Sequence, residues 1–129
     1  MKTNIQTVEA LYRAVRANDY AAFAALCIPD VEWIQNKGFP GGATQRGAQA
    51  VVDEVFRVFD SAWENWGFDI EQYLDAGDSV VVTGKYRGRY RASGKSFSAS
   101  AAHIYDLKGG KIYRFRQFTD TKFVCDAKV

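Results

Sequence analysis

The sequence contains a single histidine, His103, within a run of residues typical of a β-strand. An imidazole titrates near neutral pH, so a histidine held on a rigid strand is a candidate general acid or base. The alternative interpretation is a hydrogen-bonded wall residue that only orients a ligand or a neighbouring side chain. A hydroxyl of Tyr105 or Tyr12 and the amide of Gln117 could assist it. These residue types indicate proton transfer on a small carbonyl compound.

The turn at residues 109–110 decides which face of the last hairpin carries His103. A three-residue loop pairs His103 with Phe115 and keeps Gln117 on the same, mostly apolar face. A two-residue loop puts His103 on the face of the arginines, which are Arg114 and Arg116. We favour the three-residue loop, because two arginines would interrupt a core face. It predicts that His103 and Gln117 share the concave face within about 8 Å.

Composition limits the classes of protein to consider. The 129 residues suit one domain, 1–129, that needs no disulfide or metal to stabilise it. A net charge of +2 argues against a nucleic-acid partner, and no apolar run reaches the roughly 20 residues of a membrane span. The two cysteines, Cys27 and Cys125, lack a metal-ligand spacing, and residues 1–15 lack the apolar core of a signal peptide. We therefore expect a reducing, cytoplasmic location and no membrane partner.

Hydrophobic periodicity and turn residues place the secondary structure. Helices are predicted over residues 3–17, around 20–26 and over 47–59, and strands over 31–35, 68–74, 79–90, 97–106 and 111–119. Residues 61–67 are predicted to be a frayed helix end or a loop. Helices followed by hairpin-connected strands are typical of an α+β domain, in which a curved antiparallel sheet wraps around the helices. On the strand 79–90, Arg87 and its neighbours form a positive row that Asp69 and Glu71 should oppose.

Short segments along nearly the whole chain resemble one family. They read VEW, GGATQRG, LDAGDSVVV, GKYRGRY, SGKSFS, AHIYDLKGGKI and FRQFTDT. The chain is similar to the SnoaL-like polyketide cyclase, ketosteroid isomerase-related branch of the nuclear transport factor 2-like superfamily, whose fold is also described as cystatin-like. The resemblance implies a cone-like curved sheet around three N-terminal helices, an internal pocket, and a homodimer formed through the outer sheet face.

The catalytic residues of that superfamily do not carry over well. The resemblance puts Trp33 where ketosteroid isomerases have their base, and an indole cannot take that proton. Their oxyanion-hole tyrosine matches a position near Leu11, and the adjacent Tyr12 is rotated by about 100° on a helix. Gln117 stands where limonene-type epoxide hydrolases have an aspartate, and an amide cannot act as that base. Neither of those mechanisms is therefore expected.

Two classes of function remain. In one, His103 moves a proton on an apolar carbonyl compound, giving isomerisation, dehydration or cyclisation without a metal or organic cofactor. In the other, the pocket binds an apolar ligand without reaction, or the protein is a dimeric scaffold. In both, the expected partners are a small apolar molecule and a second copy of the chain. The expected pocket-lining residues are Tyr12, Trp33, Gln35, Phe56, Trp63, Tyr105, Phe115 and Gln117.

Overall fold

The computed structural model describes residues 2–129 and has the expected α+β architecture. A curved, six-stranded sheet has the order β2-β1-β6-β5-β4-β3. Its strands are β1 (Cys27–Ile34), β2 (Thr44–Arg46), β3 (Trp63–Asp75), β4 (Ser79–Tyr90), β5 (Ser96–Lys108) and β6 (Lys111–Thr119). The pairs β1 and β2, β3 and β4, β4 and β5, and β5 and β6 are antiparallel, whereas β1 and β6 are parallel. The sheet is therefore mixed, since β1 follows the helical hairpin and enters beside the last strand in the same direction.

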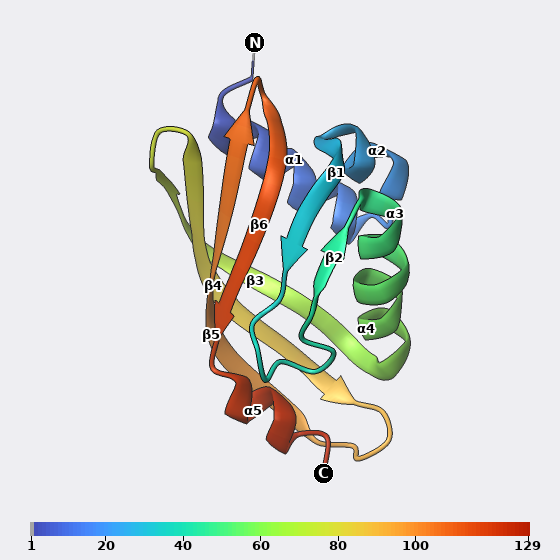
Figure 1. Cartoon of the computed structure of the whole chain (residues 1–129). Helices are drawn as coiled ribbons and strands as arrows, with labels where there is room; N and C mark the ends of the chain where they lie inside the picture. Colours follow the sequence, from blue (N-terminus) through green and yellow to red (C-terminus); the bar gives the residue numbers. More distant parts are fainter. Residues whose placement is uncertain (1) are drawn as a thin grey trace.

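Helices cover the concave face of this sheet, and a short helix lies at one end (Figure 1). They are α1 (Asn4–Arg16), α2 (Tyr20–Ala25), α3 (Ala48–Val51), the π-helical turn η1 (Val52–Phe56), α4 (Arg57–Ala62) and the terminal α5 (Thr121–Asp126). Helix α1 begins with a capping box, in which the side chains and backbones of Thr3 and Gln6 exchange hydrogen bonds. Asp19 caps α2 through the backbone N–H of Ala22.

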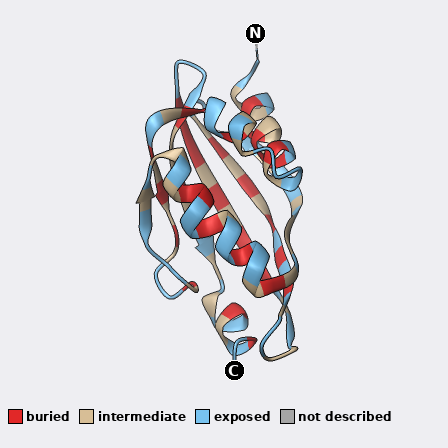
Figure 2. Cartoon of the chain, turned by 90° about the vertical axis from the view of Figure 1, so that its right-hand side faces the viewer, coloured by how far each residue is buried: buried red, intermediate tan, exposed pale blue. Residues whose placement is uncertain are grey.

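Burial follows the periods expected of each element. Along β4, buried residues alternate with exposed ones, so Val82 and Tyr86 face the helices while Arg87 faces outward. Helix α1 buries the stripe that includes Leu11 and Tyr12. Figure 2 shows these buried stripes facing one another between the sheet and the helices. The core and the concave face are thus the same region.

The register of the last hairpin, between β5 and β6, differs from the expected one. Its loop is the two-residue turn 109–110, and His103 pairs with Gln117 instead of Phe115. Both glycines have positive φ, as a type I′ two-residue hairpin turn requires. The preference for a three-residue loop was therefore wrong.

A β-bulge nevertheless keeps His103 away from the arginines. The pairing shifts between Asp106 and Leu107, so that Tyr113 is an extra residue on β6. An extra residue inverts the facing of everything beyond it, which restores His103 to the concave face and leaves Arg114 on the outer one. The expectation that a two-residue loop would place His103 with the arginines did not allow for this compensation.

Residues 61–62 end helix α4, but a second bulge explains why residues 63–67 form a strand and not a loop. Strand β3 begins at Trp63, and the residues Asn65 and Trp66 together oppose Gly88 of β4. Asn65 has a φ of 54°, in the left-handed region. The bulge turns both tryptophans to the same face, three residues apart, a spacing that looks helical in the sequence.

The outer charges of β4 pair partly as predicted. Arg87 binds Asp69 with Nε 3.0 Å from Oδ2, as expected. Glu71 forms no ion pair within residues 2–129, because it is the extra residue of a further bulge between Ile70 and Gln72. Glu64 instead binds Arg89 and Arg91, at 3.2 and 3.6 Å.

Candidate functional site

A cavity of about 460 Å³ lies between the concave face of the sheet and helices α1 and α4. This size is within the usual range for small-molecule sites, which are mostly apolar with a few placed polar groups. The residues along its wall are Leu11, Tyr12, Val15, Arg16, Asn18, Tyr20, Trp33, Gln35, Val55, Phe56, Phe59, Asp60, Trp66, Gly67, Phe68, Asp69, Tyr86, Arg87, His103, Tyr105 and Phe115. Aromatic rings dominate this wall, so it suits a flat or ring-containing ligand.

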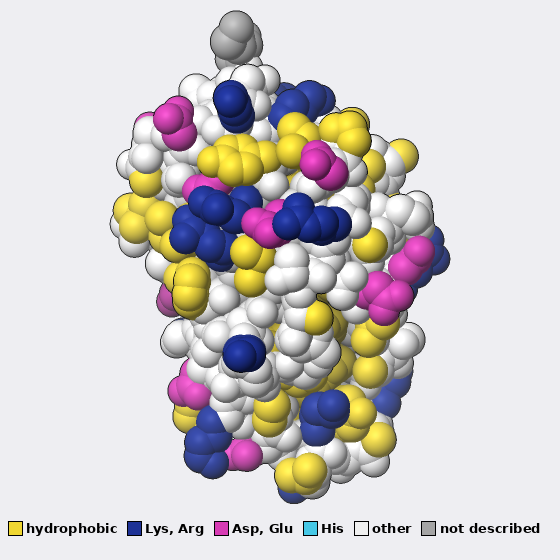
Figure 3. Space-filling view, in the orientation of Figure 1, with side chains coloured by type: hydrophobic (Ala, Val, Ile, Leu, Met, Phe, Trp, Pro, Cys, Tyr) yellow, Lys and Arg dark blue, Asp and Glu magenta, His cyan; other side chains and the backbone are white. Residues whose placement is uncertain are grey.

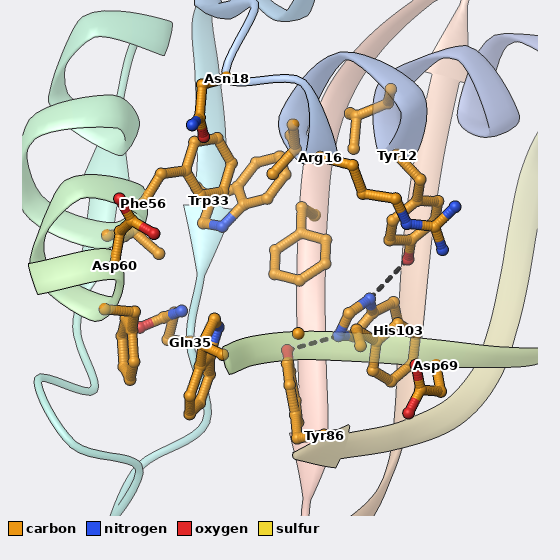
Figure 4. A pocket seen from close by; sticks show the side chains of 18 of the residues that line it. Tyr12, Arg16, Asn18, Trp33, Gln35, Phe56, Asp60, Asp69, Tyr86 and His103 are labelled. Carbon is orange, nitrogen blue, oxygen red and sulfur yellow. Dashed lines mark hydrogen bonds between the residues drawn. The ribbon is translucent and has the colours of Figure 1, made fainter. Parts of the chain in front are cut away.

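The interior wall contains a chain of buried polar groups centred on His103 (Figure 4). The hydroxyl of Tyr12 lies 2.6 Å from Nδ1 of His103, and the hydroxyl of Tyr86 lies 2.6 Å from Nε2. Nε2 of Gln117 donates to the Tyr86 hydroxyl at 2.7 Å. Oε1 of Gln117 accepts a hydrogen bond from the backbone N–H of Asn36 at 3.1 Å. We call these five residues the relay.

Burial keeps the relay uncharged. It lowers the pKa of His103 to about 3, so the imidazole is neutral at physiological pH. Burial also raises the pKa of Tyr86, although the hydrogen bond from Gln117 opposes that shift. For Tyr12, burial and then the neighbouring Tyr105 raise the pKa well above its ordinary value. Both ring nitrogens of His103 are occupied by tyrosine hydroxyls, so they are not directed at a ligand.

Exposed charged side chains and one amide lie at the cavity mouth. Arg16 and Asn18 come from the end of α1 and the residues after it, Asp60 from α4, and Asp69 and Arg87 from adjacent strands. Figure 4 shows Asp60 across the cavity from Tyr12. Asp69 is bound to Arg87, whereas Asp60 has no ion pair among residues 2–129. Asp60 is thus the lining carboxylate that is free to act on a ligand.

The cavity gathers most of the residues predicted to line it. Tyr12, Trp33, Gln35, Phe56, Tyr105 and Phe115 do so, together with His103. Trp33 stacks on Phe115 with ring centroids 4.0 Å apart. Phe56 reaches the cavity from the π-helical turn, where a continuous helix was expected.

Two predicted lining residues lie outside the cavity. Trp63 is buried among Trp66, Tyr90 and Phe97, because the bulge in β3 directs its ring toward the far end of the sheet. Gln117 lies behind Tyr86 and contacts the cavity only through the relay. Its position is explained by its pairing with His103, because Gln117 lies two residues along β6 from Phe115, the expected partner of the histidine.

Sequence reasoning did not assign site roles to Tyr86, Asp60 and Arg16. Tyr86 alternates with the arginines of its strand, and this inward position on the strand next to that of His103 is a usable signal in the sequence. Asp60 and Arg16 lie at helix ends, where a charged residue in a sequence is normally interpreted as an exposed surface residue. Within residues 2–129, no group of three or more histidine, cysteine or acidic side chains could hold a metal ion. No helix in that range is long and apolar enough to cross a membrane.

Comparisons with known proteins agree with the resemblance seen in the sequence. A family model described as SnoaL-like domain matches residues 8–115. An NTF2-like protein from Burkholderia thailandensis E264 has 40% sequence identity and a TM-score of 0.95, with 100% of this chain and 99% of that chain covered. No curated protein sequence matches the chain.

More distant solved structures share the fold alone. A protein from Catenulispora acidiphila with a ketosteroid isomerase-like fold, in complex with trimethylamine, has 21% identity and a TM-score of 0.82, with 97% of this chain and 93% of that chain covered. IdmH from Streptomyces antibioticus, a candidate polyketide cyclase, has 14% identity and a TM-score of 0.79, with coverages of 98% and 99%.

Proposed function

Because the chain belongs to the SnoaL-like domain family, we propose that its cavity binds a small, ring-containing carbonyl compound and promotes enolisation of that compound. The observation that supports this most strongly is the relay, which ends on the hydroxyl of Tyr12 in an otherwise aromatic cavity. A hydrogen-bond donor held in a buried site stabilises the negative charge that develops on a carbonyl oxygen during enolisation. The candidate cyclase IdmH has the same fold.

In this proposal, Tyr12 holds the ligand oxygen and Asp60 takes the α-proton. The two side chains face each other across the cavity, which leaves the ligand between them (Figure 4). His103 is a positioning residue, because its nitrogens hold two tyrosines and its low pKa makes it a weak base. The reaction would be an isomerisation, dehydration or cyclisation, and such proton transfers need no metal or organic cofactor.

The test uses 2-tetralone, a bicyclic ketone with acidic α-protons. We expect the protein to accelerate exchange of these protons in D₂O, followed by proton NMR. Tyr12→Phe should slow the exchange by about 100-fold to 1,000-fold, the usual effect of removing one such donor. Tyr113→Phe removes a hydroxyl from β6 away from the cavity and is the matched control. Exchange at the uncatalysed rate in the unmodified protein would contradict the enzymatic proposal.

The second candidate function is binding without reaction. This function is favoured by the exposure of Asp60 at the cavity mouth. Water stabilises an exposed carboxylate, whereas burial would make a carboxylate a stronger base. Saturable binding of 2-tetralone with no acceleration of α-proton exchange would support this function. If exchange is accelerated, Asp60→Asn tests the assignment of the base, since it should abolish exchange and leave the affinity for 2-tetralone unchanged.

We also propose that two copies of the chain pair through the outer sheet face. Phe118 is exposed there beside the half-buried residues Ile104 and Ile34. Figure 3 shows apolar side chains interspersed with charged ones on the face where β6 and β1 lie in front. A half-apolar face of this kind is commonly covered by a second copy around a twofold axis. Two free cysteines, one of them buried, support a reducing cytoplasmic location.

A further inference from the structure

We propose that the Gln117 amide fixes the direction of every hydrogen bond in the relay, so that Tyr12 presents its proton to the cavity. The cavity would then select ligands whose oxygen accepts a hydrogen bond, such as ketones, enolates and phenolates. The ligand class rests on the proposed function, whereas the direction rests on hydrogen-bond geometry alone. Gln117 is therefore a specificity-determining residue that does not line the cavity.

The direction is set at the end of the relay that lies farthest from the cavity. A backbone N–H can only donate, so the contact of Asn36 N–H with Gln117 Oε1 identifies that atom as the carbonyl oxygen. The NH₂ group of Gln117 then faces Tyr86 and donates to its hydroxyl. Asn36 is itself held, because its Oδ1 accepts from the backbone N–H of Thr119 at 2.9 Å. The amide cannot flip without losing the hydrogen bond to Asn36.

Tyr86 passes this direction to His103. Its oxygen already accepts from Gln117, and within residues 2–129 its only other hydrogen-bond partner is Nε2 of His103. If Nε2 carried a proton, the Tyr86 oxygen would receive two donors and its own proton would be buried without an acceptor, at a cost of about 1–3 kcal/mol. Tyr86 therefore donates to Nε2. The neutral imidazole then carries its single proton on Nδ1.

The proton on Nδ1 determines whether the Tyr12 hydroxyl can donate a hydrogen bond to a ligand in the cavity. Nδ1 donates to the oxygen of Tyr12. The hydroxyl proton of Tyr12 is therefore not used in the hydrogen bond to His103. Tyr12 lines the cavity and stacks beside Phe68, and Tyr105 lies edge-on to it with ring centroids 5.9 Å apart. An acceptor oxygen on a ligand can take this proton, whereas a ligand with only donor groups cannot. Successive donors polarise one another, which strengthens the last hydrogen bond.

Nitrogen-15 NMR of the unmodified protein tests the direction without any ligand. His103 is the only histidine, so the ring signals need no residue assignment, and their couplings to the two ring C–H protons distinguish Nδ1 from Nε2. We expect a protonated Nδ1 and an unprotonated Nε2 across neutral pH. Protonation on Nε2 would overturn the inference, and no variant is needed to see it.

Gln117→Glu tests the cause. An ionised carboxylate has no proton to donate, so Tyr86 would donate to it and accept from Nε2 of His103. The tautomer should switch to Nε2–H as the introduced carboxyl ionises, which carbon-13 NMR can follow in the same sample. Gln72→Glu places the same change on an exposed site of β3 and should leave the tautomer unchanged. A tautomer that does not respond to ionisation at position 117 would also overturn the inference.

Ligand preference is tested with 2-tetralone and its hydrocarbon analogue tetralin. We expect the affinity ratio of ketone to hydrocarbon to fall by about tenfold in Tyr12→Phe, with loss of the lowered infrared carbonyl stretch of bound 2-tetralone. An unchanged ratio would overturn the preference for acceptors. Absence of any 2-tetralone binding would instead count against the proposed function, because the nitrogen-15 result decides the direction independently.

Discussion

The two faces of β5 and β6 treat buried polar groups in opposite ways. His103 on the concave face and Asp106 on the outer face have the same exposure, 4%. His103 has neutral hydroxyl partners, and burial lowers its pKa to about 3, so it is uncharged. For Asp106, burial acts to raise the pKa, but hydrogen bonds from Ser79 and Arg114 and the charge of Arg116 outweigh it, and the pKa is lowered. For Asp106 the partners together outweigh burial and the group keeps its charge, whereas no partner of His103 opposes burial.

This difference suits the two faces to different tasks. The concave face holds neutral donors and acceptors in fixed directions, which an apolar ligand can meet without the cost of burying an ion. The outer face keeps a carboxylate fixed between two half-exposed arginines, with Nε of Arg114 at 2.7 Å and Nη2 of Arg116 at 3.3 Å. Such charges give orientation to a surface that is otherwise half apolar.

The largest effect that separates the faces should be the pH dependence of stability from His103. Its folded pKa of about 3 lies below the ordinary 6.5, so between these values the unfolded chain binds one more proton. The free energy of unfolding should therefore fall as pH falls, by about 1.4 kcal/mol per pH unit from this group. Chemical denaturation from pH 7 to 4 measures the slope. His103→Gln should remove this part of it, and equal slopes in the two proteins would contradict a neutral, buried imidazole.

The outer face should respond in another pH window. Asp106→Asn replaces an acceptor of three groups with an amide, and we expect the free energy of unfolding at pH 7 to fall by about 1–3 kcal/mol. Because the folded pKa of Asp106 is lowered, its stabilisation is present above its ordinary value of 3.8 and lost as pH falls through the folded pKa. The variant and the unmodified protein should therefore converge only at more acidic pH. Asp78→Asn, at an exposed site, is the control.

Much of the contrast between the concave and outer faces could be predicted from the sequence, because alternate residues of a strand point to opposite faces of the sheet. The bounds of β4 and β6 coincide with the predicted 79–90 and 111–119, and turn residues mark both. The alternation of apolar and polar residues does not locate a β-bulge, because one extra residue leaves that alternation almost unchanged nearby. The place of the bulge is decided by packing between strands. The bulge at Tyr113 changed the partner of His103, and the bulge at Asn65 moved Trp63 out of the cavity. The strand β2 and helix α5 are too short to show a period.

The relay was visible in the sequence only as residue types. His103, Tyr12 and Gln117 were identified, but their order depends on the backbone N–H of Asn36, which no side-chain pattern reveals. Tyr12 was expected to line the pocket and to assist His103, although it is rotated by about 100° from the ketosteroid isomerase position. In the folded chain Tyr12 reaches His103, because α1 packs against β3 and β4, next to the strand β5 that carries the histidine.

The smallest expected effect concerns assembly through the outer face. Light scattering at micromolar concentration should give about twice the chain mass of 14.5 kDa. Phe118 on β6 and Phe123 on α5 are almost equally exposed, at 51% and 53%, so they form a matched pair. Phe118→Glu places a charge within the apolar part of the outer sheet face and should weaken pairing by about tenfold, or roughly 1.4 kcal/mol.

Phe123→Glu adds the same charge on the terminal helix, outside the sheet face, and should leave the mass unchanged. Equal weakening by the two substitutions would place the contact at the end of the sheet near α5. A monomer in the unmodified protein would show that the outer face is stable in water without a partner.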